Sequence, residues 1–323
     1  MTAKPQNETL NAVKAIACVC VVFMHCEFPG ILGVVVQAIS RWCVPFFFMV
    51  SGYYCFYPTR EETLGKIGRK IAHVASITLW AAAFYLVVAY VEGRSFSVSA
   101  RQWFYWIVMN QPAVIVAQLW FLFALLYVYV FYFSVCWLHL RRVVFTVLPL
   151  FFVAYIALAQ GAHLVGIGVP NCYYRNFLVE GAAFFLGGGL LRKMSFEREI
   201  GITQATITLF TSTALCLVER KLLGRDFGVN ICTIPQVFAI FLIALRFDSP
   251  DETWISRVGK RYSMFVYILH PFVWHVSQHA YRVLDWDGIT IARYLMPVLV
   301  LSVTFILSHY SFVVNRVIRS RHA

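Results

Sequence analysis

A lysine and a histidine in the first apolar segment are spaced so that they share one face of a helix. Lys14 and His25 are 11 residues apart, which brings them within about 20° of each other and separates them by about 16 Å along a helix axis. Cys18 falls on the same stripe. Ionisable groups in apolar helices are costly and mark functional sites. The pattern indicates the two ends of one polar channel, or a lysine that snorkels to the interface and a histidine that caps the helix.

The second apolar segment carries Arg41, then Pro45, three phenylalanines and the pair Ser51-Gly52. Arg41 is expected near the outer end of this helix, at a depth close to that of His25. Pro45 can bend the helix, and Gly52 permits close approach of another backbone. The alternative is that Arg41 anchors the helix at the interface and that Ser51-Gly52 is a packing contact.

Two further ionisable side chains fall inside apolar segments. Glu180 lies in the run RNFLVEGAAFFLGGGLL, and His270 lies in the run around Tyr262–Phe272. Glu180 could orient His25, bind a substrate or pair with Arg175 one turn away, because an unpaired carboxylate is unfavourable in lipid. His270 could serve a site or hydrogen-bond to a neighbouring helix.

The composition shows what kind of element must position these residues. Of the 323 residues 60% are hydrophobic and 13% charged, whereas a soluble domain is about a quarter charged. A soluble fold could not cover so much apolar surface, so a bilayer must solvate it. The nine cysteines are scattered without metal-site spacing, so they are expected to be packing residues and no metal is expected.

Ten apolar segments approach the roughly 20 residues that a membrane-spanning helix needs. Their continuous runs favour helices over a barrel. Residues 102–117, rich in tryptophan and interrupted by Asn110, Gln111 and Pro112, are expected to be interfacial or re-entrant. The predicted spans are residues 9–27, 36–57, 70–91, 116–138, 143–160, 174–191, 201–218, 229–246, 262–282 and 291–314.

The basic residues predict the orientation of these spans. With the N-terminus inside, 17 of the 27 Lys and Arg residues fall in inner segments and 8 in outer segments, as the positive-inside rule requires. Both termini are therefore expected in the cytoplasm. The rule also accounts for the net charge of +12 without a nucleic-acid partner. With no repeat and no long linker, residues 1–323 are expected to form a single domain.

The first two motifs together resemble acyltransferase family 3, a family of bacterial integral membrane acyltransferases. Its members open with a basic residue, ten residues and a histidine, followed by a helix similar to RWCVPFFFMVSGYY (residues 41–54). Later matches are KIGRK (66–70), LWFLFALL (119–126) and GKRYSMFVYILHPF (259–272). The family's usual arginine is Lys14 here, which keeps the charge but loses bidentate pairing.

The resemblance implies a multi-pass protein of the bacterial cytoplasmic membrane with O-acetyltransferase activity. Such enzymes move an acyl group, commonly acetyl, from cytoplasmic acetyl-CoA to a hydroxyl of an envelope glycan or another small polar acceptor. His25 would be the general base, because a neutral histidine titrates near working pH. Arg41 and Glu180 join it as catalytic candidates. The cofactor candidates are Lys14, Lys66, Arg69 and Lys70, and the substrate-binding candidates are Ser51, Trp120, Arg175 and His270.

Two other functions fit parts of the sequence. A transporter or exporter of a small polar or acylated molecule could line its path with the same buried charges, although no matching halves with interrupted helices are found. A structural membrane subunit would leave the register of Lys14 and His25 unexplained. The acceptor, the length of the acyl chain, O- against N-acylation and the oligomeric state do not follow from the sequence.

Overall fold

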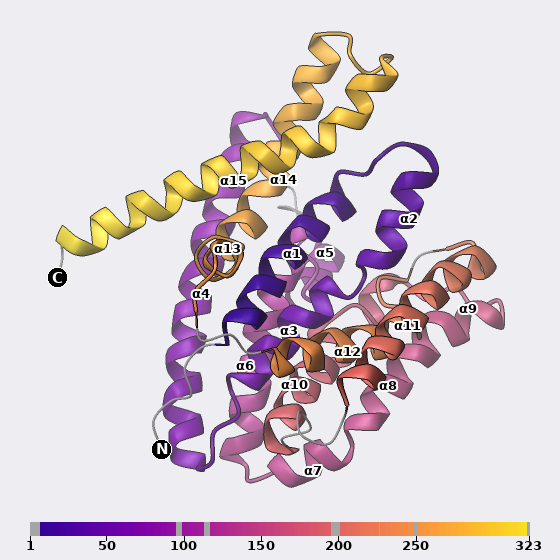
Figure 1. Ribbon diagram of the computed structural model, residues 1–323. Coiled ribbons are helices and arrows are strands. Elements are labelled where there is room, and N and C mark those ends of the chain that lie inside the picture. Colours follow the sequence, from indigo (N-terminus) through magenta and orange to yellow (C-terminus); the bar gives the residue numbers. More distant parts are fainter. Residues whose placement is uncertain are drawn as a thin grey trace. The chain divides into compact units, whose positions relative to one another are not determined.

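The computed structural model describes residues 7–94, 99–112, 117–194, 201–225, 227–247 and 251–321. Every regular element in these ranges is helical (Figure 1), which confirms the predicted all-α class. Of the basic residues assigned to inner segments, Lys4 and Arg198 lie outside the described residues. The chain forms two compact units, the first made of Met1–Val44 with Ile200–Ala323 and the second of Pro45–Glu199. The prediction of a single domain stays a prediction.

The first unit is built around α1. Its helices are α1 (Glu8–His25), α2 (Gly30–Ser40), α11 (Ile202–Leu223), α12 (Thr233–Arg246), α13 (Trp254–Arg261), α14 (Ser263–Val283) and α15 (Thr290–Arg321). α1 packs against α2, α12, α13, α14 and α15, most extensively against α13. A Cβ atom on Gly259 of α13 would overlap the carbonyl oxygen of Asn11. A glycine is therefore required for the two backbones to approach this closely.

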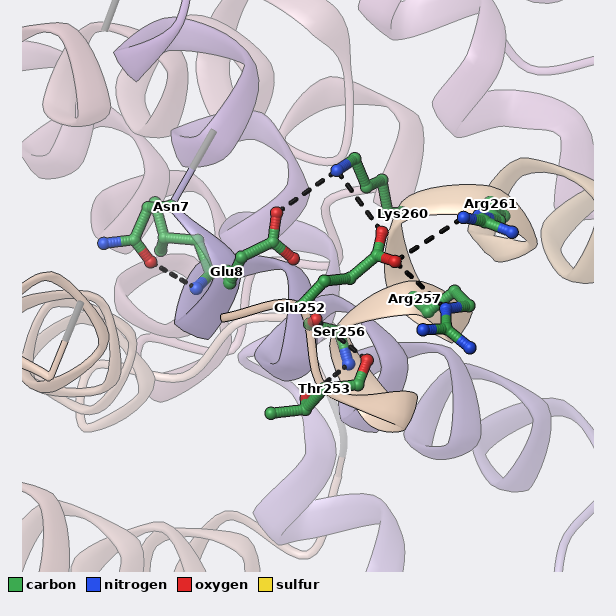
Figure 2. A network of polar contacts seen from close by, with 9 residues as sticks. Asn7, Glu8, Glu252, Thr253, Ser256, Arg257, Lys260 and Arg261 are labelled. Atoms are coloured by element: carbon green, nitrogen blue, oxygen red, sulfur yellow. Dashed lines mark hydrogen bonds and ion pairs between the residues drawn. The ribbon is translucent and has the colours of Figure 1, made fainter. Parts of the chain in front are cut away.

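An ion-pair network joins the beginning of α1 to α13 (Figure 2). Lys260 Nζ lies 3.2 Å from Glu8 Oε1 and 3.4 Å from Glu252 Oε1. Glu252 also accepts from Arg257 at 3.0 Å and lies 3.5 Å from Arg261. The hydrogen bond from Arg257 holds the pKa of Glu252 below its usual range. The network fixes the end of α1 opposite to His25.

The second unit contains α4 to α10 and most of α3. Its helices are α3 (Cys43–Tyr53), α4 (Arg60–Val91), α5 (Ala100–Ile107), α6 (Trp120–Trp137), α7 (Arg141–Thr146), α8 (Leu148–Ile156), α9 (Ala162–Leu164) and α10 (Ala182–Met194). Shorter turns are η1 (Ala117–Leu119), η2 (Ala157–Gly161), η3 (Asn171–Tyr173) and η4 (Phe177–Gly181). α4 packs along α6, and η4 contacts α6, α8 and α10.

Two glycines let α3 and α10 cross backbone to backbone. A Cβ atom on Gly52 would overlap the carbonyl oxygen of Phe185, and one on Gly188 would overlap that of Met49. Small residues at helix crossings are typical of membrane proteins, where close packing replaces the hydrophobic effect. The expected packing role of Gly52 is therefore present, with Ser51 beside it on α3.

The predicted span 36–57 is two helices rather than one. α2 ends at Ser40 and α3 begins at Cys43. Pro45 has no N–H group to bond to the carbonyl of Arg41, so the α-helical ladder is interrupted at that point. The apolar stretch also begins earlier and ends earlier than predicted, at Gly30 and Tyr53.

Six helical segments among the described residues, one of them made of α2 and α3 together, are long and apolar enough to cross a membrane. They are Glu8–His25, Gly30–Tyr53, Arg60–Val91, Ala117–Trp137, Ile202–Leu223 and Thr290–Val317. The apolar helices Leu148–Leu164 and Thr233–Arg246 are shorter, and the other predicted spans coincide with η4 and α10 and with α14. The multi-pass character is thus supported, whereas the number ten and the cytoplasmic termini stay predictions.

Candidate active site

Helix α1 carries Lys14 and His25 on one continuous helix, as their spacing predicts. α1 is unbroken from Glu8 to His25, and the N–H of Cys26 closes its last turn on the carbonyl of Val22 at 2.8 Å. Both side chains are half-buried. Lys14 forms no hydrogen bond or ion pair with any residue that the structure describes. Its ammonium group is therefore available to an anionic ligand.

His25 stacks against His270 of α14. The centroids of the two rings are 5.2 Å apart, and the ring planes are inclined by 28°. His270 is 1% exposed, whereas His25 is half-buried and can be reached from outside the helix bundle. The sequence singled out each histidine separately, and the fold brings the two together in the first unit.

The hydrogen bond of His270 fixes which ring nitrogen carries the proton. Nδ1 lies 3.0 Å from the carbonyl oxygen of Val266, and a carbonyl oxygen can only accept, so Nδ1 must donate. In the neutral ring, Nε2 is then an acceptor. No described residue donates to this buried atom. Buried polar atoms without a partner are rare, so this unpaired acceptor makes His270 a candidate for a functional role.

A polar pocket opens at the same end of α1. This cavity, of about 530 Å³, begins two residues after His25 and is lined by Glu27, Phe28, Pro29, Gly30, Val34, Gln37, Arg220, Asp287, Arg293 and Met296. The pocket brings together the carboxylates of Glu27 and Asp287 and the guanidinium groups of Arg220 and Arg293. None of these four groups forms an ion pair with a described residue. We call it the polar pocket.

The charged residues of the polar pocket are not conspicuous in the sequence. Glu27 and Arg293 fall at the ends of the predicted spans 9–27 and 291–314, and Arg220 and Asp287 lie between predicted spans. Arg220 Nε is buried without a hydrogen-bond partner in the described chain. Residues 27–37, Arg220 and residues 287–296, three segments far apart in sequence, converge here, which no local pattern reveals.

Arg41 ends α2 in the first unit. Its Nη2 atom donates to Gln37 Oε1 at 3.1 Å, and Gln37 lines the polar pocket. Arg41 is therefore linked to this pocket through one hydrogen bond, and its predicted role in orienting the acceptor stays a prediction.

Arg175 and Trp120 meet in the second unit. The Arg175 guanidinium lies 4.5 Å from the centroid of the buried Trp120 ring. Asn110 Oδ1 accepts from the N–H of Phe177 at 2.9 Å, and Gln111 Nε2 donates to the carbonyl of Arg175 at 2.9 Å. The polar residues that interrupt segment 102–117 thus hold the beginning of the predicted sixth span.

Glu180 lies in η4, a π-helical turn, and is 2% exposed. Single π-turns occur frequently at functional sites. The guanidinium of Arg175, the neighbour considered as a partner of Glu180, lies over the Trp120 ring. The role of Glu180 stays a prediction.

The residues of the basic run 66–70 have different surroundings. Lys66 pairs with Glu62 at 2.6 Å and lies over the ring of Tyr57. Lys70 donates to the carbonyl of Tyr54 at 3.1 Å, whereas Arg69 is exposed. Lys66 and Lys70, two of the four predicted ligands of the cofactor, thus have partners within the second unit, and their role toward the cofactor stays a prediction.

The comparisons with known proteins concern nearly the whole chain. The family described as "Acyltransferase domain" matches residues 7–311. A curated relative, the serine/alanine racemase of Enterococcus gallinarum, is 24% identical over 314 residues, which cover 83% of this chain and 41% of the relative. The chain thus spans about two fifths of that relative's length. No solved structure matches. The extent of the family match shows that this chain belongs to acyltransferase family 3.

Proposed function

We propose that the protein is a multi-pass enzyme of the bacterial cytoplasmic membrane that transfers an acyl group from acyl-CoA to a hydroxyl group. Acetyl is the simplest acyl group, and an envelope sugar or another small polar molecule is the acceptor. The observation that carries the proposal is the stacked pair of His25 and His270 at the end of α1 where the polar pocket opens. Family membership supports the acyltransferase chemistry.

His25 is assigned as the general base. The acceptor oxygen attacks the thioester carbonyl while His25 removes the hydroxyl proton, and the tetrahedral intermediate then expels the CoA thiolate. A neutral imidazole is suited to this step because it accepts a proton near neutral pH. Its half-buried position supports the assignment, since a base must reach the proton that it removes.

His270 is assigned to bind the acceptor. With Nδ1 held by the carbonyl of Val266, Nε2 accepts a hydrogen bond from a second hydroxyl of the acceptor, next to the one that His25 deprotonates. An acceptor with neighbouring hydroxyl groups, such as a sugar, satisfies both rings at once. A site built to bind a hydroxyl discriminates strongly against analogues that lack it.

The polar pocket is assigned to the remainder of the acceptor. Carboxylates accept hydrogen bonds from hydroxyl groups, and guanidinium groups donate to their oxygens. Glu27, Asp287, Arg220 and Arg293 supply both kinds of group around one cavity. Unpaired charges of both signs suit a ligand with many hydroxyl groups better than an apolar one.

The orientation proposed is that of the positive-inside rule, with both termini in the cytoplasm and His25 near the outer end of α1. Lys14, without an internal partner, would then face the cytoplasmic donor, with the acyl group moving toward His25. Glu180, Arg175 and Trp120 remain candidates in the second unit, where the π-turn at Glu180 supports a functional role.

The experiment that tests the function combines two measurements. Purified protein in detergent is incubated with acetyl-CoA, and the release of CoA thiol is followed with and without candidate sugars. Envelope glycans and lipids of cells with and without the protein are compared by mass spectrometry for a lost acyl mass. Acceptor-dependent thiol release together with a lost acyl mass supports the proposal. Substrate uptake into vesicles without any use of acetyl-CoA would instead show a transporter.

A further inference from the structure

The second unit contains a strongly basic cavity whose lining includes none of the predicted site residues. It has a volume of about 420 Å³ and is lined by Phe56, Pro58, Arg60, Cys136, His139, Arg141, Arg142, Phe145 and Lys193. We call it the basic pocket. Four of its nine lining residues are permanently cationic, and none is a carboxylate.

The cations of the basic pocket are held by groups that leave their charge uncompensated. Arg60 donates to the carbonyl oxygens of Cys136 at 3.1 Å and Trp137 at 2.9 Å. The Arg141 guanidinium lies 3.8 Å from the centroid of the Phe56 ring. These partners are neutral. Among the residues that the structure describes, no carboxylate pairs with any of the four cations.

Two further cations complete the pocket with freer side chains. Lys193 lies 5.9 Å from the ring centroid of Phe145, and Arg142 makes no side-chain contact of this kind with the described chain. Both are exposed. Because they are not bound elsewhere, they can move onto a ligand at little cost.

The positive-inside rule explains only part of this arrangement. It places basic residues in inner loops, and all four cations come from predicted inner segments. It does not require residues 56–60, residues 136–145 and Lys193 in the last turn of α10 to converge on one cavity. Like charges gathered without counter-ions repel each other, so the arrangement favours a bound anion.

The residue types indicate phosphate as the anion. The fork of an arginine matches two phosphate oxygens, and a lysine adds a point charge. Arginine planes also stack on rings, which suits a nucleotide base. We propose that the basic pocket binds phosphate groups and, resting on the proposed function, that these are the ribose phosphate and pyrophosphate of the acyl-CoA donor. The pocket thereby takes the role predicted for Lys66, whose charge is compensated by Glu62.

The phosphate of an anionic lipid has the same chemistry, and the test must separate the two sources. Binding of CoA and of dephospho-CoA, which lacks the ribose phosphate, is measured by calorimetry on the full-length protein in detergent. Binding to nanodiscs or vesicles with and without phosphatidylglycerol is measured in parallel. The test variant is Arg142→Gln with Lys193→Gln, and the control is Arg94→Gln with Arg101→Gln, two exposed cations of the same unit outside the pocket. Melting temperatures check folding.

The expected result is at least a tenfold loss of CoA affinity in the test variant, with the control unchanged. Dephospho-CoA should bind the wild type more weakly, and the affinity for CoA should fall with salt. Unchanged CoA affinity with lost binding to phosphatidylglycerol would overturn the nucleotide assignment in favour of lipid. Unchanged binding of both would overturn the phosphate site.

The failure of this inference can be told apart from the failure of the proposed function. His25→Ala should keep CoA binding while it abolishes acyl transfer. If the wild type transfers no acyl group, but the test variant still loses CoA binding, the proposed function fails and the phosphate site stands.

Discussion

Replacing His270 by asparagine removes one ring nitrogen and keeps the position of the other. The asparagine amide can still donate to the carbonyl of Val266, which Nδ1 contacts at 3.0 Å. The Nε2 atom, the buried acceptor without a partner, is lost. Glutamine is the matched variant, because its longer side chain returns an oxygen acceptor to about the position of Nε2.

The magnitude follows from the hydrogen bond that Nε2 is proposed to accept. A substrate hydroxyl left unpaired in a buried site costs about 1–3 kcal/mol. At about 1.4 kcal/mol for each factor of ten, kcat/KM for the acceptor should fall about 5- to 150-fold in His270→Asn. The loss should be smaller in His270→Gln. The stacked ring pair contributes a further ~0.5–1.5 kcal/mol, which should appear in thermal stability and not in the rate.

The assay measures CoA release at saturating acetyl-CoA while the acceptor concentration is varied. Thermal melting in detergent shows whether each variant is folded. A folded His270→Asn that kept the wild-type kcat/KM would show that Nε2 does not bind the acceptor. Equal losses of activity in the asparagine and glutamine variants, in proportion to their losses of stability, would show that His270 serves packing alone.

Three other changes test different parts of the account. Gly188→Ala forces overlap with the backbone of α3 and should destabilise the protein by about 1–3 kcal/mol in detergent melting, whereas Gly68→Ala, which meets no atom within 4 Å, should not. The hydrogen bond from Arg257 lowers the pKa of Glu252 in the folded protein. The ionised Glu252 therefore stabilises the fold at pH values above its ordinary pKa of 4.5, and this stabilisation is lost as the pH falls through the pKa that Glu252 has in the folded protein. Glu252→Gln should therefore weaken the acid dependence of the melting temperature; equal pH profiles would contradict this. Asp287→Asn should raise KM for the acceptor severalfold and leave KM for acetyl-CoA unchanged, and a change in the donor KM alone would remove Asp287 from the acceptor site.

The helical class and the face shared by Lys14 and His25 were predictable because both depend on local periodicity. Apolar runs report burial in lipid, and a spacing of three turns is a property of one helix. The break between α2 and α3 was harder to predict from the sequence. Pro45 signalled a bend, but only the structure shows that the lost hydrogen bond falls at Arg41 and ends one helix there.

The partners within the site were not predictable, since they depend on tertiary contacts between distant segments. Nothing near His25 in the sequence points to His270, and nothing near Arg60 points to Arg142 or Lys193. The run 66–70 predicted a ligand site from its dense charge pattern, and the structure shows that Lys66 pairs with Glu62 one turn away. The ligand role of this run stays a prediction. The density of basic residues along the chain indicates which segments lie in inner loops. A binding site requires side chains from distant segments to lie close together in the fold.

The assignment of His25 as the general base is tested most directly by measuring acyl transfer by the purified protein with His25 replaced by alanine. The control is His279→Ala, an exposed histidine of α14. The account predicts that a folded His25→Ala loses acceptor-dependent release of CoA by about 10²- to 10⁴-fold, the usual contribution of a general base. His279→Ala should match the wild type. If a folded His25→Ala transferred the acyl group at the wild-type rate, His25 would not be the general base.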